Sequence, residues 1–451
     1  MLLSAHQLIG ALLAGALITL AQVVTGGDEP QPADAQAPAA APVAENVDLS
    51  EPLHRDPALA EQTPPDAKVP DAPAPAADPT APATSPAPEQ PPAPRAALDL
   101  LGEHVLPGTS ARLVWSPDQS FEGIAVPTAV LVVHGERNGP TVCLTAALHG
   151  DELNGIEIVR RVLYDLDPKQ LAGTVIGVPI VNLHGFRRNS RYLPDRRDLN
   201  RFFPGAAHGS SASRIAHSFF EQVIRRCDAL VDIHTGSFQR TNLPQLRADM
   251  KVPAVAGLTS GFTATSVLHS PGEPGTLRRA AVEVGIPAVT LETGEPGRLQ
   301  QRKIEHGTQG ITGLFDHLGM LPRASARPAP EPVYYESIWV RADRGGLLFG
   351  EVSLGQRVRS GELLATVTDP ITNVRSELRA PQDGRVLGMA LNQVVMPGFA
   401  AFRIGIPTTE SDLASPAAAA PDAMAPADPN APAPAPAPAE GSAPPPDEEN
   451  S

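Results

Sequence analysis

Histidine and carboxylate residues stand at the ends of three apolar stretches of this sequence. The segment LTAALHGDE contains His149 and Glu152 with two residues between them. The segments LVDIHTGS and AVTLETG contain His234 and Glu292. Two histidines and one carboxylate can hold a single zinc ion and leave its fourth position open for water. A further carboxylate beside that position can act as general base and then protonate a leaving amine. The sequence therefore suggests one zinc ion per chain, bound by the first three residues, with Glu292 as the base.

Each of these motifs has an alternative interpretation when it is taken alone. With twelve histidines in the chain, a spacing of the His149–Glu152 kind arises by chance roughly half the time. Asp151 and Glu152 could instead be acids in the first turn of a helix, where the helix dipole favours them. Asp232 could orient His234 or point to the opposite face of its strand. Glu292 could cap a helix or loop.

Residues 185–205 hold a dense group of arginines between the first two motifs. Six arginines fall within fifteen residues, accompanied by only Asp195 and Asp198. A solvated surface is the usual explanation of such density, but the flanking apolar and aromatic residues favour a loop that packs onto the domain. Because a guanidinium binds a carboxylate through two hydrogen bonds, we expect at least one arginine to address an anionic substrate. The six are Arg187, Arg188, Arg191, Arg196, Arg197 and Arg201.

The elements that must position these side chains alternate between apolar strands and amphipathic helices. This alternation predicts an α/β fold with a mixed, mostly parallel sheet flanked by helices. In such a sheet, functional residues gather at the carboxyl ends of the strands, where the motifs lie. The expected strands are 129–135, 140–150, 174–185, 228–236 and 287–294, and the expected helices are 152–166, 211–227 and 276–285.

Residues 333–406 form a separate C-terminal β-module with short strands and glycine turns. Residues 355–367 and 392–404 are a near-repeat, which predicts a small barrel-like or sandwich-like unit with pseudo-two-fold symmetry. The module resembles the biotinyl/lipoyl carrier fold. Those carriers need a lysine at a hairpin tip, and no lysine follows Lys303. The module is therefore expected to be structural or to shape the substrate site, without covalent biotin or lipoate.

Two Ala/Pro-rich acidic segments, 28–98 and 407–451, are expected to be disordered spacers. They contain too few aromatic and β-branched residues to bury a core. Residues 28–95 carry a net charge of −9 and residues 407–451 a net charge of −8, against −15 for the whole chain. The folded part is therefore close to neutral, which excludes a basic nucleic-acid-binding domain.

The N-terminal residues 1–27 are expected to be a signal peptide or a membrane anchor. No charged residue occurs from Leu8 to Val24, and this apolar run is close to the shortest that spans a bilayer. Thr19-Leu20-Ala21 offers a small-residue cleavage pattern, although the usual basic residues before the apolar run are missing. We therefore expect a periplasmic or other extracytoplasmic location, with an inner-membrane tether if the segment is retained.

The chain has two cysteines, Cys143 and Cys227, which both lie in apolar stretches. An oxidising compartment would permit a disulfide bond between them. Buried free thiols behave as small apolar side chains, and two such thiols are the interpretation favoured here.

The motifs HGDE, SRYLPDRRDLNRFFPG, DIHTG and LETG, in this order and spacing, resemble the succinylglutamate desuccinylase/aspartoacylase family. These proteins are zinc amidohydrolases related to the metallocarboxypeptidases. The resemblance covers roughly residues 110–320 and implies that residues 99–325 are a zinc hydrolase catalytic domain. It implies His149, Glu152 and His234 as zinc ligands and Glu292 as general base and acid. It further implies that Arg191 polarises the scissile carbonyl and that Asn200 and Arg201 hold the substrate carboxylate.

The expected function is zinc-dependent deacylation, the hydrolysis of an amide bond next to a carboxylate in an N-acyl amino acid or a similar small substrate. The expected partner is a small anionic acylated or peptide substrate. Two alternatives stay open. An exported carboxypeptidase-like peptidase would act on peptides or cell-wall fragments. A tethered binding module without activity would retain the metal and hydrolyse nothing.

Overall fold

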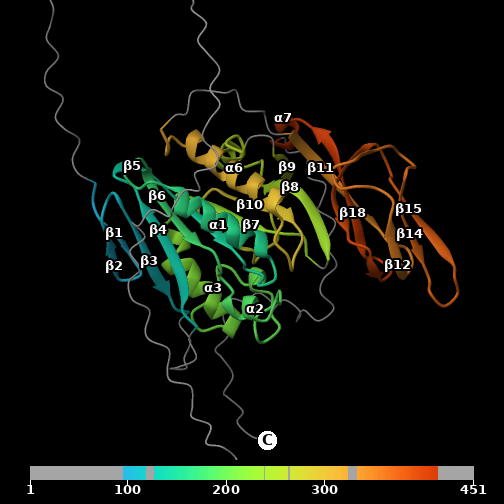
Figure 1. Ribbon diagram of the computed structural model, residues 1–451, viewed down its shortest axis with the longest axis horizontal. Helices are drawn as coiled ribbons and strands as arrows, with labels where there is room; N and C mark the ends of the chain where they lie inside the picture. Colours follow the sequence, from blue (N-terminus) through green and yellow to red (C-terminus); the bar gives the residue numbers. More distant parts are fainter. Residues whose placement is uncertain (1–94, 118–125, 238, 263–264, 323–332, 415–451) are drawn as a thin grey trace, which may run out of the picture. The chain divides into compact units, whose positions relative to one another are not determined.

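The computed structural model describes residues 95–117, 126–237, 239–262, 265–322 and 333–414 (Figure 1). The expected signal or anchor segment, most of the 28–98 spacer and residues 415–451 lie outside the described residues. Ordered structure extends past both predicted spacer borders. Arg95 donates hydrogen bonds to the carbonyls of Gly135 and Gly173 at 2.9 and 2.6 Å, and Leu413 is buried in the core of the domain. In the described ranges, no helix has both the length and the hydropathy required to cross a bilayer.

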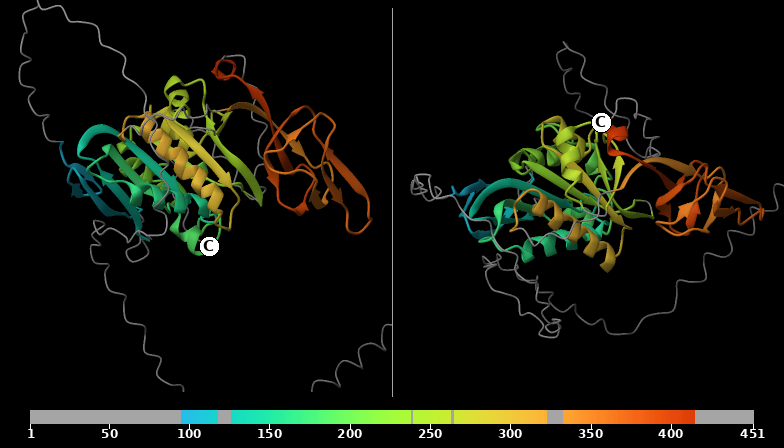
Figure 2. Two further views of the ribbon diagram at one scale, coloured as in Figure 1. Left: turned by 45° about the horizontal axis from the view of Figure 1, so that its top comes forward. Right: turned by 90° about the horizontal axis from the view of Figure 1, so that it is seen from above.

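A mixed sheet of twelve strands forms the centre of the fold, as predicted, with helices on its faces (Figures 1 and 2). Strands β6, β5, β7 and β10 are parallel neighbours in that order, and β4 and β3 extend the sheet in antiparallel orientation. The bounds are β3 Thr109–Trp115, β4 Thr128–His134, β5 Arg137–Ala146, β6 Ala172–Val178, β7 Ala229–His234, β8 Arg240–Ala248, β9 Ser266–His269 and β10 Ala288–Gly294. A separate hairpin pairs β1 Leu98–Leu100 with β2 Glu103–Val105.

Helices cover the two faces of this sheet with separate hydrophobic clusters. On one face, α1, α4 and α6 pack on the sheet through a cluster that includes Ile158 and Leu314. On the other face, α3 and α5 pack through a cluster that includes Phe219 and Leu277. The helices are α1 Leu153–Asp165, α2 Leu183–Arg187, α3 Ser211–Gln222, α4 Pro253–Thr259, α5 Leu277–Glu283, α6 Gln301–His317 and α7 Glu410–Ala414. Short 3-10 turns occupy Leu199–Arg201 and Ile224–Arg226.

One predicted strand, 174–185, is only half correct. Strand β6 ends at Val178, one residue before Pro179, which has no backbone N–H for a strand pairing. Helix α2 then begins at Leu183, because the Asn182 side chain accepts a hydrogen bond from the backbone N–H of Gly185 and caps the helix. The second half of the predicted strand is therefore a loop and a capped helix.

The C-terminal module consists of two sheets around its own hydrophobic core. One sheet has the order β15, β14, β12, β17, and the other is the end of the twelve-stranded sheet, where β13, β16, β18 and β11 follow one another. Their inner faces enclose a cluster that includes Leu364, Val386 and Phe402. The bounds are β11 Val333–Arg341, β12 Gly346–Gly350, β13 Arg357–Val358, β14 Leu363–Thr368, β15 Arg375–Arg379, β16 Gly384–Ala390, β17 Gln393–Val395 and β18 Ala400–Thr408.

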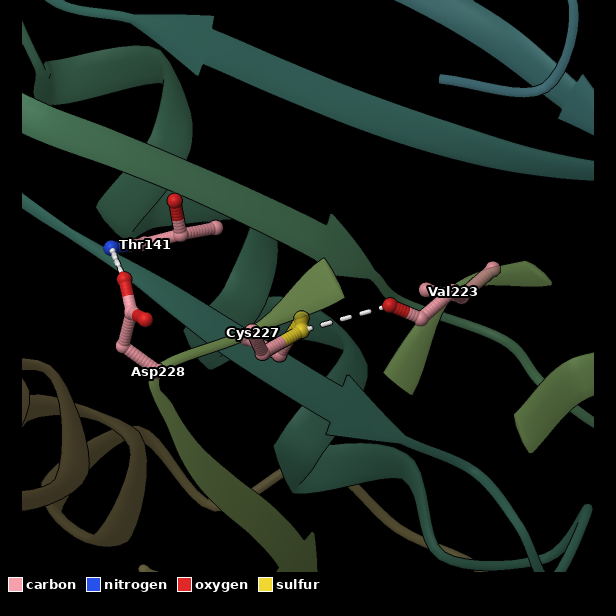
Figure 3. The surroundings of a disulfide bond; sticks show 5 residues. Thr141, Val223, Cys227 and Asp228 are labelled. Carbon is pink, nitrogen blue, oxygen red and sulfur yellow. Dashed lines mark hydrogen bonds between the residues drawn. A yellow bond between two sulfur atoms is a disulfide. The ribbon is translucent and has the colours of Figure 1, made fainter. Parts of the chain in front are cut away.

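The expectation of two free thiols was wrong, because Cys143 and Cys227 form a disulfide bond (Figure 3). Cys143 lies in β5 and Cys227 lies two residues before β7, the parallel neighbour of β5. Thr141 and Asp228 hold the two segments together, since the Thr141 N–H donates to the Asp228 carboxylate at 2.7 Å. This pairing brings the two Cα atoms to 5.8 Å, a separation that a disulfide spans. The sequence alone does not predict this bond, because the bond depends on β5 and β7 being neighbours in the sheet.

We expect unreduced, denatured protein to contain no titratable thiol and reduced protein to contain two. Cys227→Ser should lower the free energy of unfolding by about 2–5 kcal/mol, because it reopens an 84-residue loop in the unfolded chain. Thiol titration and denaturant unfolding measure the two effects. The double variant Cys143→Ser/Cys227→Ser should lose little more than the single variant. Two reactive thiols in the unreduced protein would rule out the bond.

Candidate metal centre and active site

Three neighbouring parallel strands end at one place in the sheet and carry the predicted site. Strand β7 lies between β5 and β10, with Ala146 opposite Ile233 and Glu292 opposite His234. Strand β7 ends at His234, and β5 leads after Ala146 into the segment that holds His149 and Glu152. The carboxyl ends of these strands therefore bring together residues that lie far apart in the sequence, as the predicted α/β sheet required.

The segment after β5 is shaped so that Glu152 faces the histidines. Gly150 allows this turn to pass against α2, since a Cβ at this position would lie 2.0 Å from the backbone of Gly185. Glu152 occupies the N-cap position of α1, but its side chain makes no capping hydrogen bond. Its carboxylate bonds to His149 and His234 instead. Glu152 therefore lies at the start of the helix, just before its first turn, and its carboxylate serves the histidine cluster and does not cap the helix.

His149, Glu152 and His234 form a buried cluster whose ligand atoms all lie within 4.8 Å of one another. One Glu152 oxygen lies 2.8 Å from His149 Nδ1 and the other lies 2.8 Å from His234 Nδ1. The two Nδ1 atoms are 3.2 Å apart. The side chains are 2–4% exposed. Three potential ligands from two distant segments of the chain thus converge on one point.

Further carboxylates hold the outer nitrogen of each histidine. His234 Nε2 lies 2.7 Å from Asp232, which in turn accepts a hydrogen bond from the Thr145 hydroxyl at 2.7 Å. His149 Nε2 lies 3.1 Å from Asp198. Asp232 therefore orients His234, which was the first of its two predicted alternatives. Both rings direct Nδ1 toward Glu152, in the manner of metal-binding histidines whose other nitrogen bonds to a carboxylate. The residues present fit a zinc ion with imidazole and carboxylate ligands.

Arg191 belongs to the same network. Its guanidinium donates to Asp198 at 2.8 Å and to Glu152 at 3.3 Å, and its side chain is 12% exposed. The nearby Asn200 accepts a hydrogen bond from the backbone N–H of Leu277 through its side-chain oxygen. Arg201 is exposed and donates to the Asn200 carbonyl at 2.8 Å. Arg191 is thus fixed beside the cluster, whereas the substrate-binding roles of Asn200 and Arg201 stay predictions.

The charges in this buried network shift its pKa values strongly. Burial and Arg191 disfavour a charged His149, but Glu152 and Asp198 outweigh them and raise its pKa. Burial also opposes a charge on His234, yet Asp232 and Glu152 raise the pKa of this histidine well above its usual range. Burial would raise the pKa of Glu152, but the two histidines hold the pKa of this carboxyl far below its usual range. The buried carboxylates therefore make both imidazoles hold a proton up to a higher pH than an ordinary histidine does.

Glu292 lies on β10 beside this cluster and is held by residues that sequence reasoning missed. The Asn242 side chain donates to one Glu292 oxygen at 2.9 Å, and Arg247 lies 3.3 Å from the other oxygen. Both partners come from β8, which no sequence pattern predicted. Glu292 is within a strand and only 7% exposed, so it caps neither a helix nor a loop. Because each carboxylate oxygen of Glu292 has its own partner, the orientation of this side chain is fixed.

His184, the last residue of the predicted 174–185 strand before Gly185, is not part of the metal cluster. It lies in α2 and lines a small pocket with Pro117 and Leu193. Arg187, the last residue of α2, and Arg188, its C-cap, are exposed. Asp198 and Thr145 were missed as partners of the site. Asp198 could have been found, because it stands beside Asn200 and Arg201 in the arginine-rich segment.

Comparison with known proteins identifies the domain that carries this site. Residues 138–318 match the succinylglutamate desuccinylase/aspartoacylase catalytic domain. The chain is 28% identical over 287 residues to N-alpha-acetyl-L-2,4-diaminobutyric acid deacetylase from Halomonas elongata. That alignment covers 60% of this chain and 83% of the relative.

Solved structures share the fold over most of their length. A succinylglutamate desuccinylase/aspartoacylase from Rhodobacter sphaeroides is similar with a TM-score of 0.59 and 25% identity. The product-bound ectoine utilization protein EutE (DoeB) from Ruegeria pomeroyi is similar with a TM-score of 0.59 and 26% identity. Each alignment covers 66% of this chain and 94% of the solved chain.

We expect zinc to bind more tightly at about pH 8 than at about pH 6. Metal binding requires neutral imidazoles, so the protons that the raised pKa values retain on His149 and His234 must leave. The affinity should rise by up to about ten-fold per pH unit for each displaced proton. Competition with a chelator, corrected for the protonation of the chelator itself, measures this dependence.

A matched variant, His184→Gln, removes a histidine outside the cluster and should keep the same pH dependence. Equal zinc affinity at both pH values would show that the imidazoles do not carry these protons.

Proposed function

The chain belongs to the succinylglutamate desuccinylase/aspartoacylase family, and on this premise we propose that it is a zinc-dependent deacylase of small N-acyl amino acids. The observation that carries the proposal is the convergence of His149, Glu152 and His234 within 4.8 Å, with Glu292 on the adjacent strand. When bound, a zinc ion supplies a Lewis acid and makes a water molecule easier to deprotonate. The ligands leave its open side for that water and the substrate.

Glu292 carries the proton in this proposal. It accepts a proton as the water oxygen bonds to the carbonyl carbon, and it returns a proton to the amide nitrogen as the C–N bond breaks. The second proton of the water leaves the new carboxylic acid for the amine or the solvent, so the products are a carboxylate and an amine that is protonated at neutral pH, and Glu292 ends as it began. Asn242 and Arg247 support this role because they fix both carboxylate oxygens. A carboxylate that is already held in the reactive orientation loses less entropy in the transition state, which raises the rate of proton transfer.

Two arginines and one amide group supply the positive charge and the hydrogen-bond donors that an anionic substrate requires. Arg191 is fixed by Asp198 beside Glu152, so it can stabilise negative charge on the carbonyl oxygen as the C–O bond forms. Arg201 is exposed and can bind the substrate carboxylate. The oxygen of the Asn200 side chain is already used by Leu277. Because a carboxylate only accepts hydrogen bonds, Asn200 would contribute its amide NH₂ group.

The relative from Halomonas elongata is named for N-alpha-acetyl-L-2,4-diaminobutyric acid, which makes this compound the first substrate to test. A direct experiment gives the purified zinc-loaded protein this compound, other N-acyl amino acids and short peptides side by side. Release of the amine from the acyl amino acids alone supports the deacylase. Cleavage of peptides alone indicates the carboxypeptidase-like alternative, and no hydrolysis at all indicates a binding module.

We also propose that the protein works outside the cytoplasm. The apolar run from Leu8 to Val24 and the Cys143–Cys227 disulfide support this location, since such bonds persist in oxidising compartments. Fractionation of cells that produce the full chain tests the proposal. Recovery of the protein in the cytoplasmic fraction with both thiols free would contradict it.

Glu292→Gln should lower kcat by at least about 100-fold, because the amide cannot accept and return the proton. Zinc content should stay at the wild-type level, since Glu292 is not among the three ligands. The matched control is Glu295→Gln, in which the neighbouring buried carboxylate pairs with the exposed Arg298. That variant should keep nearly full activity. Full turnover by Glu292→Gln would reject the assigned role.

A further inference from the structure

The β-module is joined to the catalytic sheet through a closed ring of five hydrogen-bonded strands. Strand β8 pairs with β9, β9 with β11, β11 with β18, β18 with β16, and β16 returns to β8. A small hydrophobic cluster formed by Leu268, Tyr335 and Leu387, with Leu243 packed against it, joins residues of these strands. The first residues of β8 are therefore held on both sides, by the catalytic sheet and by the module.

Arg240, the first residue of β8, is held tightly by the module. Its guanidinium lies 5.3 and 5.2 Å from the ring centroids of Trp339 and Phe399, and it donates to the Ala400 carbonyl at 3.1 Å. Burial, followed by the charges of Arg247 and Arg191, lowers the pKa of Arg240 to about 10. The module therefore helps to hold the start of β8, although the strand belongs to the catalytic sheet.

Asn242 connects this junction to the active site. It lies opposite Gly294 of β10 on one side and opposite Gly388 of β16 on the other. Its side chain is 4% exposed and donates to Glu292 at 2.9 Å. A Cβ on Gly388 would lie 2.8 Å from the Asn242 side-chain oxygen. The module strand thus contacts the amide group that holds the carboxylate.

We propose that the C-terminal β-module positions the active-site base, with Gly388 of β16 setting the Asn242 amide that orients Glu292. Gly388 and Asn242 are positioning residues, and the inference rests on the proposed role of Glu292. The absence of a side chain at position 388 leaves room for the amide in the one orientation that donates to Glu292. A methyl group there would lie closer to the amide oxygen than a Cβ contact allows, so the buried amide must shift, and its hydrogen bond to Glu292 shifts with it.

Gly388→Ala tests the proposal without changing any group that touches the metal or the substrate. Its backbone φ lies outside the left-handed region, so alanine is tolerated there apart from the contact with Asn242. We expect kcat to fall by about 10- to 100-fold, as for a catalytic group moved by up to an ångström. KM and zinc content should change little. The control is Gly350→Ala in the same module, where the new Cβ would meet its nearest atom at 3.5 Å.

A double-mutant cycle shows whether Gly388 acts through Asn242. Asn242→Ala alone should also lower kcat, because Glu292 loses its amide donor. In that background, Gly388→Ala should cost little more, because the atom that the methyl group would strike is gone. Full activity of Gly388→Ala, or losses that multiply in the double variant, would overturn the proposal.

The test separates this proposal from the proposed function. Wild-type protein that hydrolyses no N-acyl amino acid would reject the function. The same cycle measured on the unfolding midpoint needs no substrate, and it still decides whether Gly388 and Asn242 are coupled. Wild-type activity that falls in Glu292→Gln but not in Gly388→Ala would retain the function and reject the role of the module.

Discussion

The whole site depends on one carboxylate shared between two imidazoles. Glu152 gives one oxygen to His149 and the other to His234, each at 2.8 Å. Burying this carboxylate is costly unless positive charge compensates it. In the protein without metal, that charge comes from the imidazoles and Arg191, and in the metal-bound protein the cation would supply it. Three features keep the side chains of His149, Glu152 and His234 facing one another: the surrounding aspartates, the strand register and the tight turn at Gly150.

The parts of the site that were predictable lie on patterns local in the sequence. His149, Glu152 and His234 could be found because apolar strands end at them and because parallel strands present their carboxyl ends at one edge. The predicted mixed sheet with flanking helices is confirmed for the same reason, since each strand and helix has its own periodicity. The predicted metal ligands converge as the pattern required.

The parts that were missed depend on pairings between distant segments. Strand β8 contains polar residues and Pro244, and a bulge occurs where it pairs with β10, so no alternation marks it as a strand. Its residues Asn242 and Arg247 therefore gave no signal of their contact with Glu292. The Cys143–Cys227 bond was predicted wrongly for a similar reason, because it depends on how β5 lies beside β7. Such contacts depend on which strands are neighbours and on how their residues are aligned, and a single sequence does not reveal either.

The closed five-strand ring also protects the catalytic domain from association with other chains. Strand β9 and the start of β8 would otherwise present unpaired N–H and C=O groups along an open border of the sheet, which can pair with a strand from another molecule. Strands β11 and β16 occupy that border. A chain that ends before residue 333 would therefore expose an unpaired strand edge. Poor solubility of such a chain would reflect this edge and would not show that the module takes part in catalysis.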